Sequence, residues 1–340
     1  MSKLLTISIP TWNRAKILDG ALYHLLHQVN EFEKLIDVVI SDNYSSDNTS
    51  EIIKKWQHKY PHIKFTVYHQ SRNTGFYGNF QKCKELSTGK FIWVLSDDDY
   101  VCKDVICNII SILQKYKSTL AILYLNNKVI NARINNSSSY KITKIDKLFY
   151  KYNYRLTLVS TTIFLNHKEN DKFIYKKFEN SNFIGFALMV DVIRFRNETA
   201  ILSGKLLKCR MDTISGYNFF DAFIFNIFSI FNYMVSIGYS NKIIRIFKEN
   251  LIIHIWAKRY FYFKAKGKLD ANLEYYDLKT ANHILQKYFK GTISYWLIIF
   301  PMTLFPSSVF RKCFPYVEKL RNFMRSINRL FPINTKCTVK

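Results

Sequence analysis

Three consecutive carboxylates, Asp97–Asp99, follow a run of five apolar residues, Phe91–Leu95, with only Ser96 between them. The apolar run predicts a buried strand, so the carboxylates would stand at its carboxyl end, where open α/β sheets bind ligands. Three adjacent negative charges are costly unless a cation neutralises them, and oxygen ligands suit Mg²⁺ or Mn²⁺, which usually arrive with a phosphorylated substrate. The alternative is an acidic turn, with Asp99 as the cap of the next helix.

Polar loops also follow two other predicted strands in the first hundred residues. The strand Leu4–Ile9 leads into the loop Pro10–Arg14, and the strand Ile36–Ile40 leads into the loop Ser41–Thr49. Predicted helices alternate with the strands, which is typical of a doubly wound, mostly parallel sheet of the α/β class. Because the carboxyl ends of parallel strands meet at one edge, we expect these loops to converge with the acidic run.

Apolar spacing predicts the remaining elements of this part of the chain. Pro10 cannot donate to a ladder and is expected to end the first strand. Helices are expected at residues 14–29, from about 50, from the 72–79 loop to about 87, at 103–116 and at 184–195. Further strands are expected at 63–68, 120–125, 156–165, and either 200–202 or 205–207, with a polar stretch at 126–147.

Four motifs in this order resemble those of family 2 glycosyltransferases, which have the GT-A fold. The motifs are Ser8–Arg14, Ile40–Thr49, Arg72–Phe76 and Leu95–Asp99. They look closest to the bacterial branch that includes abequosyltransferases of O-antigen synthesis, and the resemblance fades beyond about residue 130. It implies an inverting, metal-dependent transfer of a sugar from a nucleotide-diphosphate sugar to a lipid-linked or growing bacterial surface glycan. One departure is Ser96, which stands where the commonest family motif has its first aspartate.

The resemblance also implies roles for individual residues. Asp42 matches the carboxylate that pairs with the nucleotide base or ribose. Asp98 would bind Mn²⁺ or Mg²⁺ directly, with Asp99 in support. The other residues implied to contact the nucleotide are Pro10, Thr11, Asn13, Arg14, Asn43, Arg72, Asn73 and Asp97.

The catalytic base is less clearly marked. An inverting transfer needs a carboxylate to take a proton from the attacking hydroxyl. The family supplies it after the strand predicted at 156–165, often within an acidic pair that is missing here. Glu179 falls nearest to the family position and Asp191 lies in an apolar helical stretch, whereas Glu169 and Asp171 sit in a lysine-rich loop. A surface salt bridge is the alternative role for each.

A later segment resembles the Arg-x-His segment of the family. Arg210 would neutralise the diphosphate leaving group, and Asp212 stands where the histidine would be and would add a metal ligand. We expect a glycosyltransferase domain at residues 1–215, with a nucleotide-binding half at 1–125 and an acceptor half at 126–215. Residues 216–340 are expected to form a helical, basic, membrane-associating region.

The positive charge is concentrated after residue 100. Residues 1–100 carry 12 Lys and Arg against 11 Asp and Glu, whereas residues 101–340 carry 38 against 14. This asymmetry indicates a polyanionic partner, either nucleic acid or an anionic membrane. The stretch 306–340 has eight basic residues, one acid (Glu318) and interleaved aromatics, which is typical of an interfacial membrane helix. A solvated basic face is the alternative interpretation.

Two apolar stretches raise the question of membrane insertion. Residues 219–237 carry a narrow polar stripe, which favours a packed or interfacial helix over a spanning one. Residues 295–305 include a proline and are too short to cross. With scattered cysteines and no signal peptide, we expect a peripheral protein at the cytoplasmic face of the bacterial inner membrane. Its acceptor would be carried on polyprenyl diphosphate.

Three other functions fit parts of the sequence. A nucleotidyltransferase is disfavoured because no glycine-rich triphosphate loop follows the first strand. A nucleic-acid-binding protein is disfavoured by the acidic run and the lack of a recognisable nucleic-acid module, so no nucleic-acid partner is expected. A non-catalytic relative that has lost its base remains an open alternative.

Overall fold

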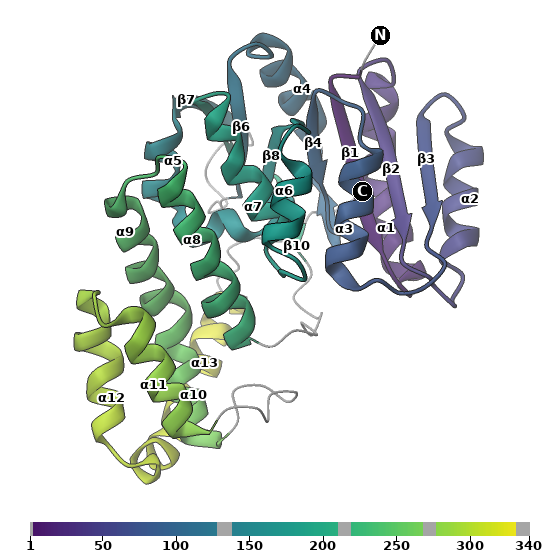
Figure 1. Cartoon of the computed structure of the whole chain (residues 1–340). Coiled ribbons are helices and arrows are strands. Elements are labelled where there is room, and N and C mark those ends of the chain that lie inside the picture. The colour runs from purple at the N-terminus through teal and green to yellow at the C-terminus, as the bar shows by residue number, and fades with distance from the viewer. Residues whose placement is uncertain (1–2, 128–137, 210–218, 268–276, 331–340) are drawn as a thin grey trace. The chain divides into compact units, whose positions relative to one another are not determined.

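The structure, a computed structural model, describes residues 3–127, 138–209, 219–267 and 277–330. The chain forms two compact units, whose elements can be followed in Figure 1 by the colour that runs with residue number. The first unit is built mainly from residues up to 148 and from 155 to 214, and the second from 149–154 and 215–333. The domain boundary predicted after residue 215 lies outside the described residues and stays a prediction.

An eight-stranded mixed sheet, in the order β3-β2-β1-β4-β8-β6-β9-β7, forms the centre of the first unit. Its strands are β1 (Leu5–Thr11), β2 (Ile36–Asp42), β3 (Lys64–His69), β4 (Phe91–Val94), β6 (Leu120–Asn127), β7 (Ser139–Lys144), β8 (Thr162–Leu165) and β9 (Glu198–Gly204). The strands β3, β2, β1 and β4 pair in parallel, as do β6 and β9, whereas β8 and β7 run antiparallel to their neighbours. The predicted α/β class with a mostly parallel sheet is therefore confirmed.

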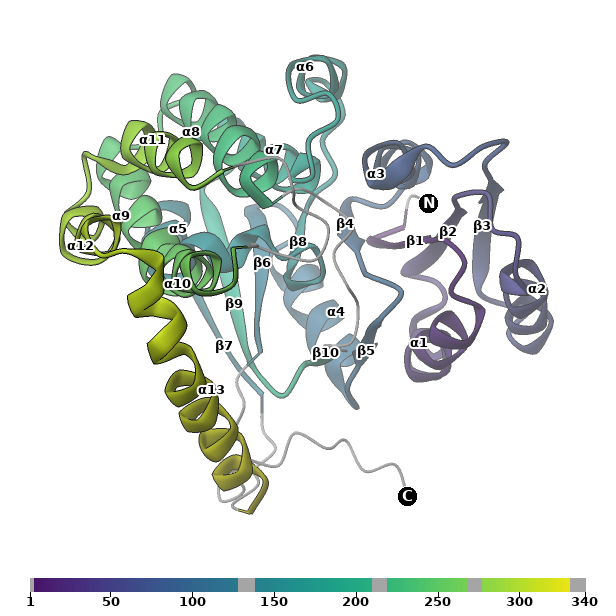
Figure 2. The same cartoon turned by 90° about the horizontal axis from the view of Figure 1, so that it is seen from below.

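Helices cover both faces of this sheet (Figure 2). On one face lie α1 (Ala15–Val29), α2 (Thr49–Lys59) and α4 (Val105–Lys115), and on the other lie α3 (Gly75–Leu86), α6 (Asp171–Lys177) and α7 (Ile184–Asp191). Helix α1 turns Leu18, Leu22, Leu25 and Leu26 inward, and this spacing of three and four residues explains why the segment is helical. A short antiparallel ribbon joins β5 (Asp99–Val101) to β10 (Leu207–Cys209).

Pro10 does not end the first strand, contrary to the prediction. Strand β1 continues to Thr11 and stays paired with β2. The backbone carbonyl of Ser8 accepts a hydrogen bond from the side of the strand where β4 lies. Pro10 is two residues further along the strand, so its backbone nitrogen faces the same side. Pairing of β1 with β4 has already ended at Ser8, so the missing N–H of Pro10 has no ladder bond to break.

The middle of the first unit also differs from the prediction. The strand expected at 156–165 shrinks to β8, and 3₁₀ turns precede it. The Thr161 hydroxyl donates to the Leu158 carbonyl at 2.7 Å, a local bond that competes with a ladder. Strand β7 lies in the polar stretch 126–147, where no strand was predicted, and is followed by α5 (Ile145–Tyr152). Among the described strands it pairs with β9 alone and lies at the edge of the sheet, so its polar residues can face water.

The second unit is helical, as expected. Its elements are η5 (Asp221–Asn226), α8 (Ile227–Ser236), α9 (Asn241–Leu251), η6 (Ile252–Trp256), α10 (Ala257–Lys266), α11 (Leu278–Phe289), η7 (Tyr295–Ile299), α12 (Phe300–Leu304) and α13 (Ser307–Leu330). Buried aromatic rings form much of its core. Among them are Phe231 and Phe247, whose ring centroids lie 4.8 Å apart. In the described ranges no single helix is long and apolar enough to cross a membrane. One pair of helices, Tyr295–Leu304 with Ser307–Lys319, is long and apolar enough when the two are taken together, but the two helices are bent by 113°.

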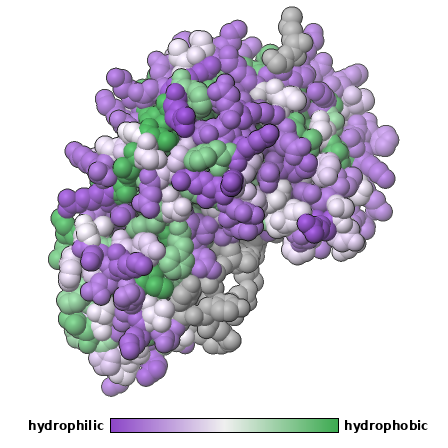
Figure 3. All heavy atoms as spheres, in the orientation of Figure 1, coloured by the Kyte–Doolittle hydropathy of each residue, from purple (hydrophilic) through white to green (hydrophobic). Residues whose placement is uncertain are grey.

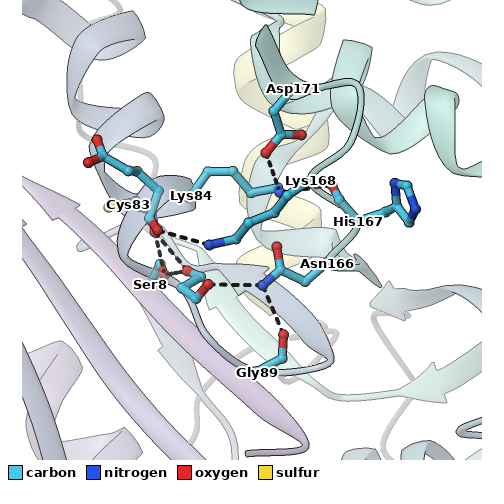
Figure 4. Close-up of polar contacts among 10 residues, drawn as sticks. Ser8, Cys83, Lys84, Gly89, Asn166, His167, Lys168 and Asp171 are labelled. Carbon is cyan, nitrogen blue, oxygen red and sulfur yellow. Dashed lines mark hydrogen bonds and ion pairs between the residues drawn. The ribbon is translucent and has the colours of Figure 1, made fainter. Parts of the chain in front are cut away.

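Polar contacts fasten the segment after β8 to helix α3 and the loop that follows it (Figure 4). Lys84 of α3 is buried, and its Nζ donates to Asp171 Oδ2 at 2.7 Å and to the His167 carbonyl at 3.1 Å. Burial lowers the pKa of Lys84, and the Asp171 carboxylate opposes that change. The Asn166 amide donates to two carbonyls of the α3–β4 loop at 3.1 and 2.8 Å. These contacts fix where α6 begins.

Asp171→Ala should destabilise the chain by about 3–5 kcal/mol, because it leaves the charge of Lys84 buried without its partner. Glu85→Ala is the matched control, since it breaks an exposed pair in the same helix, to Lys82 at 2.7 Å. That control should cost about 1 kcal/mol or less. Urea unfolding of both variants measures the difference, and equal small costs would contradict a charged, buried Lys84.

Candidate functional site

The carboxyl ends of β1, β2, β3 and β4 lie along one edge of the parallel part of the sheet. The predicted convergence of the polar loops follows from this order. The loop after β1 contacts the acidic run, because Thr11 Oγ1 donates to Asp97 Oδ2 at 2.8 Å. It also contacts the loop after β2, because the backbone N–H of Asn43 donates to the Thr11 carbonyl at 2.9 Å.

Asp97 is the buried member of the acidic run. Arg14 Nη1 donates to Asp97 Oδ1 at 2.7 Å, and Thr11 holds the other oxygen. Burial raises the pKa of Asp97, whereas Arg14 and Thr11 oppose the rise by stabilising the ionised form. The pKa of Arg14 is raised: burial lowers it, but the attraction of Asp97 outweighs this. Asp97 thus joins two loops inside the protein, and its predicted contact with a nucleotide stays a prediction.

Asp98 and Asp99 lie in more open surroundings than Asp97, and both are partly accessible to solvent. Asp98 Oδ2 is 3.5 Å from Arg14 Nη1, and its Oδ1 accepts a hydrogen bond from the Ser96 hydroxyl. Asp99 begins β5 and does not cap a helix, so the alternative interpretation of Asp99 was wrong. The geometry therefore separates one buried carboxylate from two that can reach a ligand.

Asp42 and His69 form a second acidic position on the same edge. Asp42 ends β2 and is buried, and its Oδ1 accepts the backbone N–H of Ser45 at 3.1 Å. Its Oδ2 lies 3.1 Å from Nδ1 of His69, which ends β3 and exposes half of its side chain. His69 is not among the site residues predicted from the sequence. Its signal was available, because His69 directly follows a predicted parallel strand.

Asparagine side chains fasten the loops at this edge. Asn43 Nδ2 donates to Asn73 Oδ1 at 2.8 Å, and Asn43 Oδ1 accepts the backbone N–H of Thr74 at 2.9 Å. Asn13 Oδ1 accepts the backbone N–H of Ser46 at 2.7 Å. These amides hold the loops after β1, β2 and β3 in register with one another. The predicted contacts of the three asparagines with a nucleotide stay predictions.

Three exposed side chains project from the same loops, namely Trp12, Tyr44 and Arg72. Across the described residues, no hydrogen bond or ion pair engages the Arg72 guanidinium. Tyr44 has a φ of +67°, a conformation that costs about 1–3 kcal/mol for a bulky residue and is typical of functional loops. Trp12 and Tyr44 are not among the site residues predicted from the sequence, although aromatic residues within a polar loop are a usable signal. Their flat faces suit stacking on a base or a sugar.

The two candidate bases have different surroundings. Glu179 is exposed just after α6, and it adds to the raised pKa of Tyr77, which is due first to burial. Asp191 is buried in α7, where its Oδ1 accepts from the Asn170 amide at 3.0 Å. Both roles stay predictions. The structure gives the Asp191 carboxylate a hydrogen bond inside the fold and leaves the Glu179 carboxylate open to solvent.

Arg210 and Asp212 lie outside the described residues, so their predicted roles stay predictions. Within the described ranges, no cluster of three or more His, Cys, Asp or Glu side chains could hold a metal ion alone. The oxygen donors of Asp98 and Asp99 nevertheless fit Mg²⁺ or Mn²⁺. Such ions are typically held by one or two carboxylates together with water and the phosphates of the substrate.

Comparisons by sequence match part of the chain to known glycosyltransferases. Residues 6–173 match the family model described as "Glycosyl transferase family 2". The abequosyltransferase RfbV of Salmonella typhimurium is 34% identical over 125 residues, which are 36% of this chain and 35% of RfbV. A Campylobacter jejuni GalNAc(5)-diNAcBac-PP-undecaprenol β-1,3-glucosyltransferase is 30% identical over 95 residues, 28% of this chain and 29% of that protein. The matched part thus spans about a third of these relatives.

Solved structures share the fold over most of the chain. TarS of S. aureus, residues 1–349 with UDP, superposes with a TM-score of 0.59 at 17% identity, covering 83% of this chain and 78% of TarS 1–349. The mannosyltransferase PcManGT of Pyrobaculum calidifontis, with GDP-Man and Mn²⁺, gives a TM-score of 0.51 at 12% identity, covering 97% and 88%. At such identities the likeness shows the fold alone.

Asp97→Asn and Asp98→Asn should differ in their effect on stability. Asp97→Asn weakens the bonds to Arg14 and Thr11 in a buried place and should cost about 2 kcal/mol. Asp98→Asn keeps its shape in a partly solvated place and should change the free energy of unfolding by about 0.5 kcal/mol or less. Urea unfolding in metal-free buffer tests this, and equal costs would contradict the separation of the two carboxylates.

Proposed function

The chain belongs to glycosyl transferase family 2, and on this premise we propose that it transfers a sugar from a nucleoside-diphosphate sugar to a hydroxyl of a glycan. The observation that carries the proposal is the edge of the sheet where Asp98 lies beside the Asp97–Arg14 pair. Asp42 stands at the end of β2, which is separated from β4 by β1, on the same edge. In this proposal, acceptors for a base and ribose and a site for a diphosphate would lie along one line of loops.

The donor site would use Asp42, which the fold buries, together with side chains that the fold leaves accessible. Asp42, oriented by His69, would hold the nucleoside, and the exposed ring of Trp12 would stack on its base. The exposed guanidinium of Arg72 would bind phosphate oxygens. Asp98, supported by Asp99, would hold Mn²⁺ or Mg²⁺, which when bound neutralises the leaving diphosphate. Arg14 keeps Asp97 in place and lies close enough to orient Asp98 as well.

Glu179 is our choice as the base that takes the proton from the acceptor hydroxyl. Its carboxylate is exposed beside α3, and among the described residues no hydrogen bond or ion pair engages it. Lys84 and Asp171 anchor the helix that leads to Glu179. Asp191 is the weaker choice, since its carboxylate already binds Asn170 within the core.

The acceptor would be a glycan carried on polyprenyl diphosphate, and the protein would work as a peripheral protein at the cytoplasmic face of the inner membrane. The name of the Campylobacter jejuni relative, which includes a PP-undecaprenol glycan, supports this choice of acceptor. The excess of positive charge after residue 100 supports an anionic lipid surface as the partner.

One nucleoside diphosphate should bind the chain tightly in the presence of Mn²⁺ and weakly without it. Calorimetry with UDP, GDP, CDP and TDP identifies the base, and Asp98→Asn should lose the metal-dependent part, about 100-fold in affinity. Glu85→Ala is the control and should bind as the unmodified chain does. Binding of no nucleotide, or unchanged binding by Asp98→Asn, would count against the donor site.

Glu179→Gln should slow sugar transfer by about 10²- to 10⁴-fold and leave nucleotide binding unchanged, because only proton removal is lost. Asp191→Asn is the comparison variant and should keep its rate per folded molecule within a few-fold. The measurement is transfer of radiolabelled sugar from the identified donor into the lipid extract of bacterial membranes. If only Asp191→Asn slows transfer, the base is Asp191.

A further inference from the structure

An apolar surface lies on the second unit, along the helix η7–α12 and at the bend before α13. It consists of five side chains, each between 46% and 72% exposed, and we call it the apolar tip: Ile293, Trp296, Leu297, Leu304 and Phe305. Figure 3 shows hydrophobic surface over α12, at the lower left of the view. A soluble surface rarely gathers so many large apolar side chains in one short segment unless it binds something apolar.

The helical register explains why the tip is exposed. Residues 293, 297, 300 and 304 recur at intervals of four, three and four, so they share one face of the helix η7–α12. Tyr295 and Ile299 lie on a different face and are fully buried against the unit. The helix is therefore apolar on both sides, although only one side is covered by protein. A helix that is apolar all round is normally buried on all sides.

Polar contacts at both ends hold this helix in place. The Glu249 carboxylate accepts the backbone N–H groups of Ile293 and Ser294, both at 2.8 Å, at the start of the helix. Lys264 is buried and donates to the carbonyls of Met302 and Phe305, where the helix ends. Both ends are thus capped from inside the unit. The exposed apolar face is a built feature of the fold and not a frayed terminus.

Positive charge flanks the tip in the sequence. The stretch 278–317 contains no Asp or Glu but has five basic residues, Lys279, Lys287, Lys290, Arg311 and Lys312. Trp296 Nε1 donates to the Lys290 carbonyl at 2.8 Å, so a tryptophan and a lysine lie next to each other at the base of the tip. Apolar side chains with tryptophan and flanking cations match the layers of an anionic lipid surface.

We infer that the apolar tip inserts into the headgroup–acyl boundary of an anionic bilayer, with the flanking cations on its lipid phosphates. The 113° bend favours a shallow insertion that does not cross the bilayer. A second copy of the chain fits less well, because a two-fold interface would face these cations with themselves. The inference deepens the proposed function and rests on it for its purpose, which is to hold the enzyme where a lipid-linked acceptor lies.

Vesicle sedimentation with the full chain tests the insertion. The chain should sediment with vesicles of phosphatidylcholine plus phosphatidylglycerol and much less with phosphatidylcholine alone. The double variant Leu297→Ser/Leu304→Ser should bind at least about 100-fold more weakly, since each leucine contributes about tenfold. The matched control is Val235→Ser/Ile253→Ser, which removes two exposed apolar side chains elsewhere on the same unit and should bind normally.

Tryptophan quenching by chain-brominated lipid locates the contact. Trp12 and Trp296 are exposed to the same degree, 49% and 46%, and lie in different units. Quenching should disappear in Trp296→Phe and persist in Trp12→Phe. Persistence in Trp296→Phe would overturn the inference, as would vesicle binding that survives the loss of Leu297 and Leu304.

Self-association is measured on the same samples by light scattering. A dimer that the Leu297→Ser/Leu304→Ser variant dissociates, without any vesicle binding, would overturn the inference and assign the tip to a second copy. Nucleotide binding by this variant should equal that of the unmodified chain. Failure of lipid binding and failure of the proposed donor site are therefore read separately.

Discussion

The ion pair between Arg14 and Asp97 is the interaction on which the arrangement of the site depends. A carboxylate buried at the end of a strand is stable only when a partner satisfies its charge, and Arg14 supplies that partner at 2.7 Å. Arg14 stands at the start of α1 and Asp97 follows β4, so the pair binds the first loop to the acidic run. Asp98 is then held at the edge with part of its side chain in solvent.

The other loops are positioned by short-range polar bonds of the same kind. Asn43 is fastened to the turn that opens α3, and Asp42 is fastened to His69. A parallel sheet brings strand ends together, but it does not fix the loops that extend beyond them. Here the loops themselves provide the bonds, which hold Asp42 and Asp98 on one edge.

Much of this edge could be predicted from the sequence, because alternating strands and helices dictate where polar loops meet. Which of Asp97–Asp99 is buried and which are accessible could not be predicted, since three identical side chains differ only in what the fold packs against them. Pro10 was misjudged because its effect depends on which neighbour its missing N–H would face. His69 was missed because its meaning comes from Asp42, which is 27 residues away in sequence.

Prediction from the sequence was limited in the helical unit for the same reason. Its charge and aromatic content were evident, and a basic surface was expected along 306–340. The apolar tip depends on which face of η7–α12 the unit covers, and that is a tertiary fact. Caps from Glu249 and Lys264 hold the helix that carries the exposed face.

Anomalous diffraction from crystals grown with Mn²⁺ and the preferred nucleoside diphosphate tests the assignment of the acidic edge most directly. We predict an anomalous peak within bonding distance of the Asp98 carboxylate and of the diphosphate, with the Arg14–Asp97 pair intact. A metal bound to Asp97 with Arg14 displaced, or a diphosphate bound away from Asp98, would contradict the assignment.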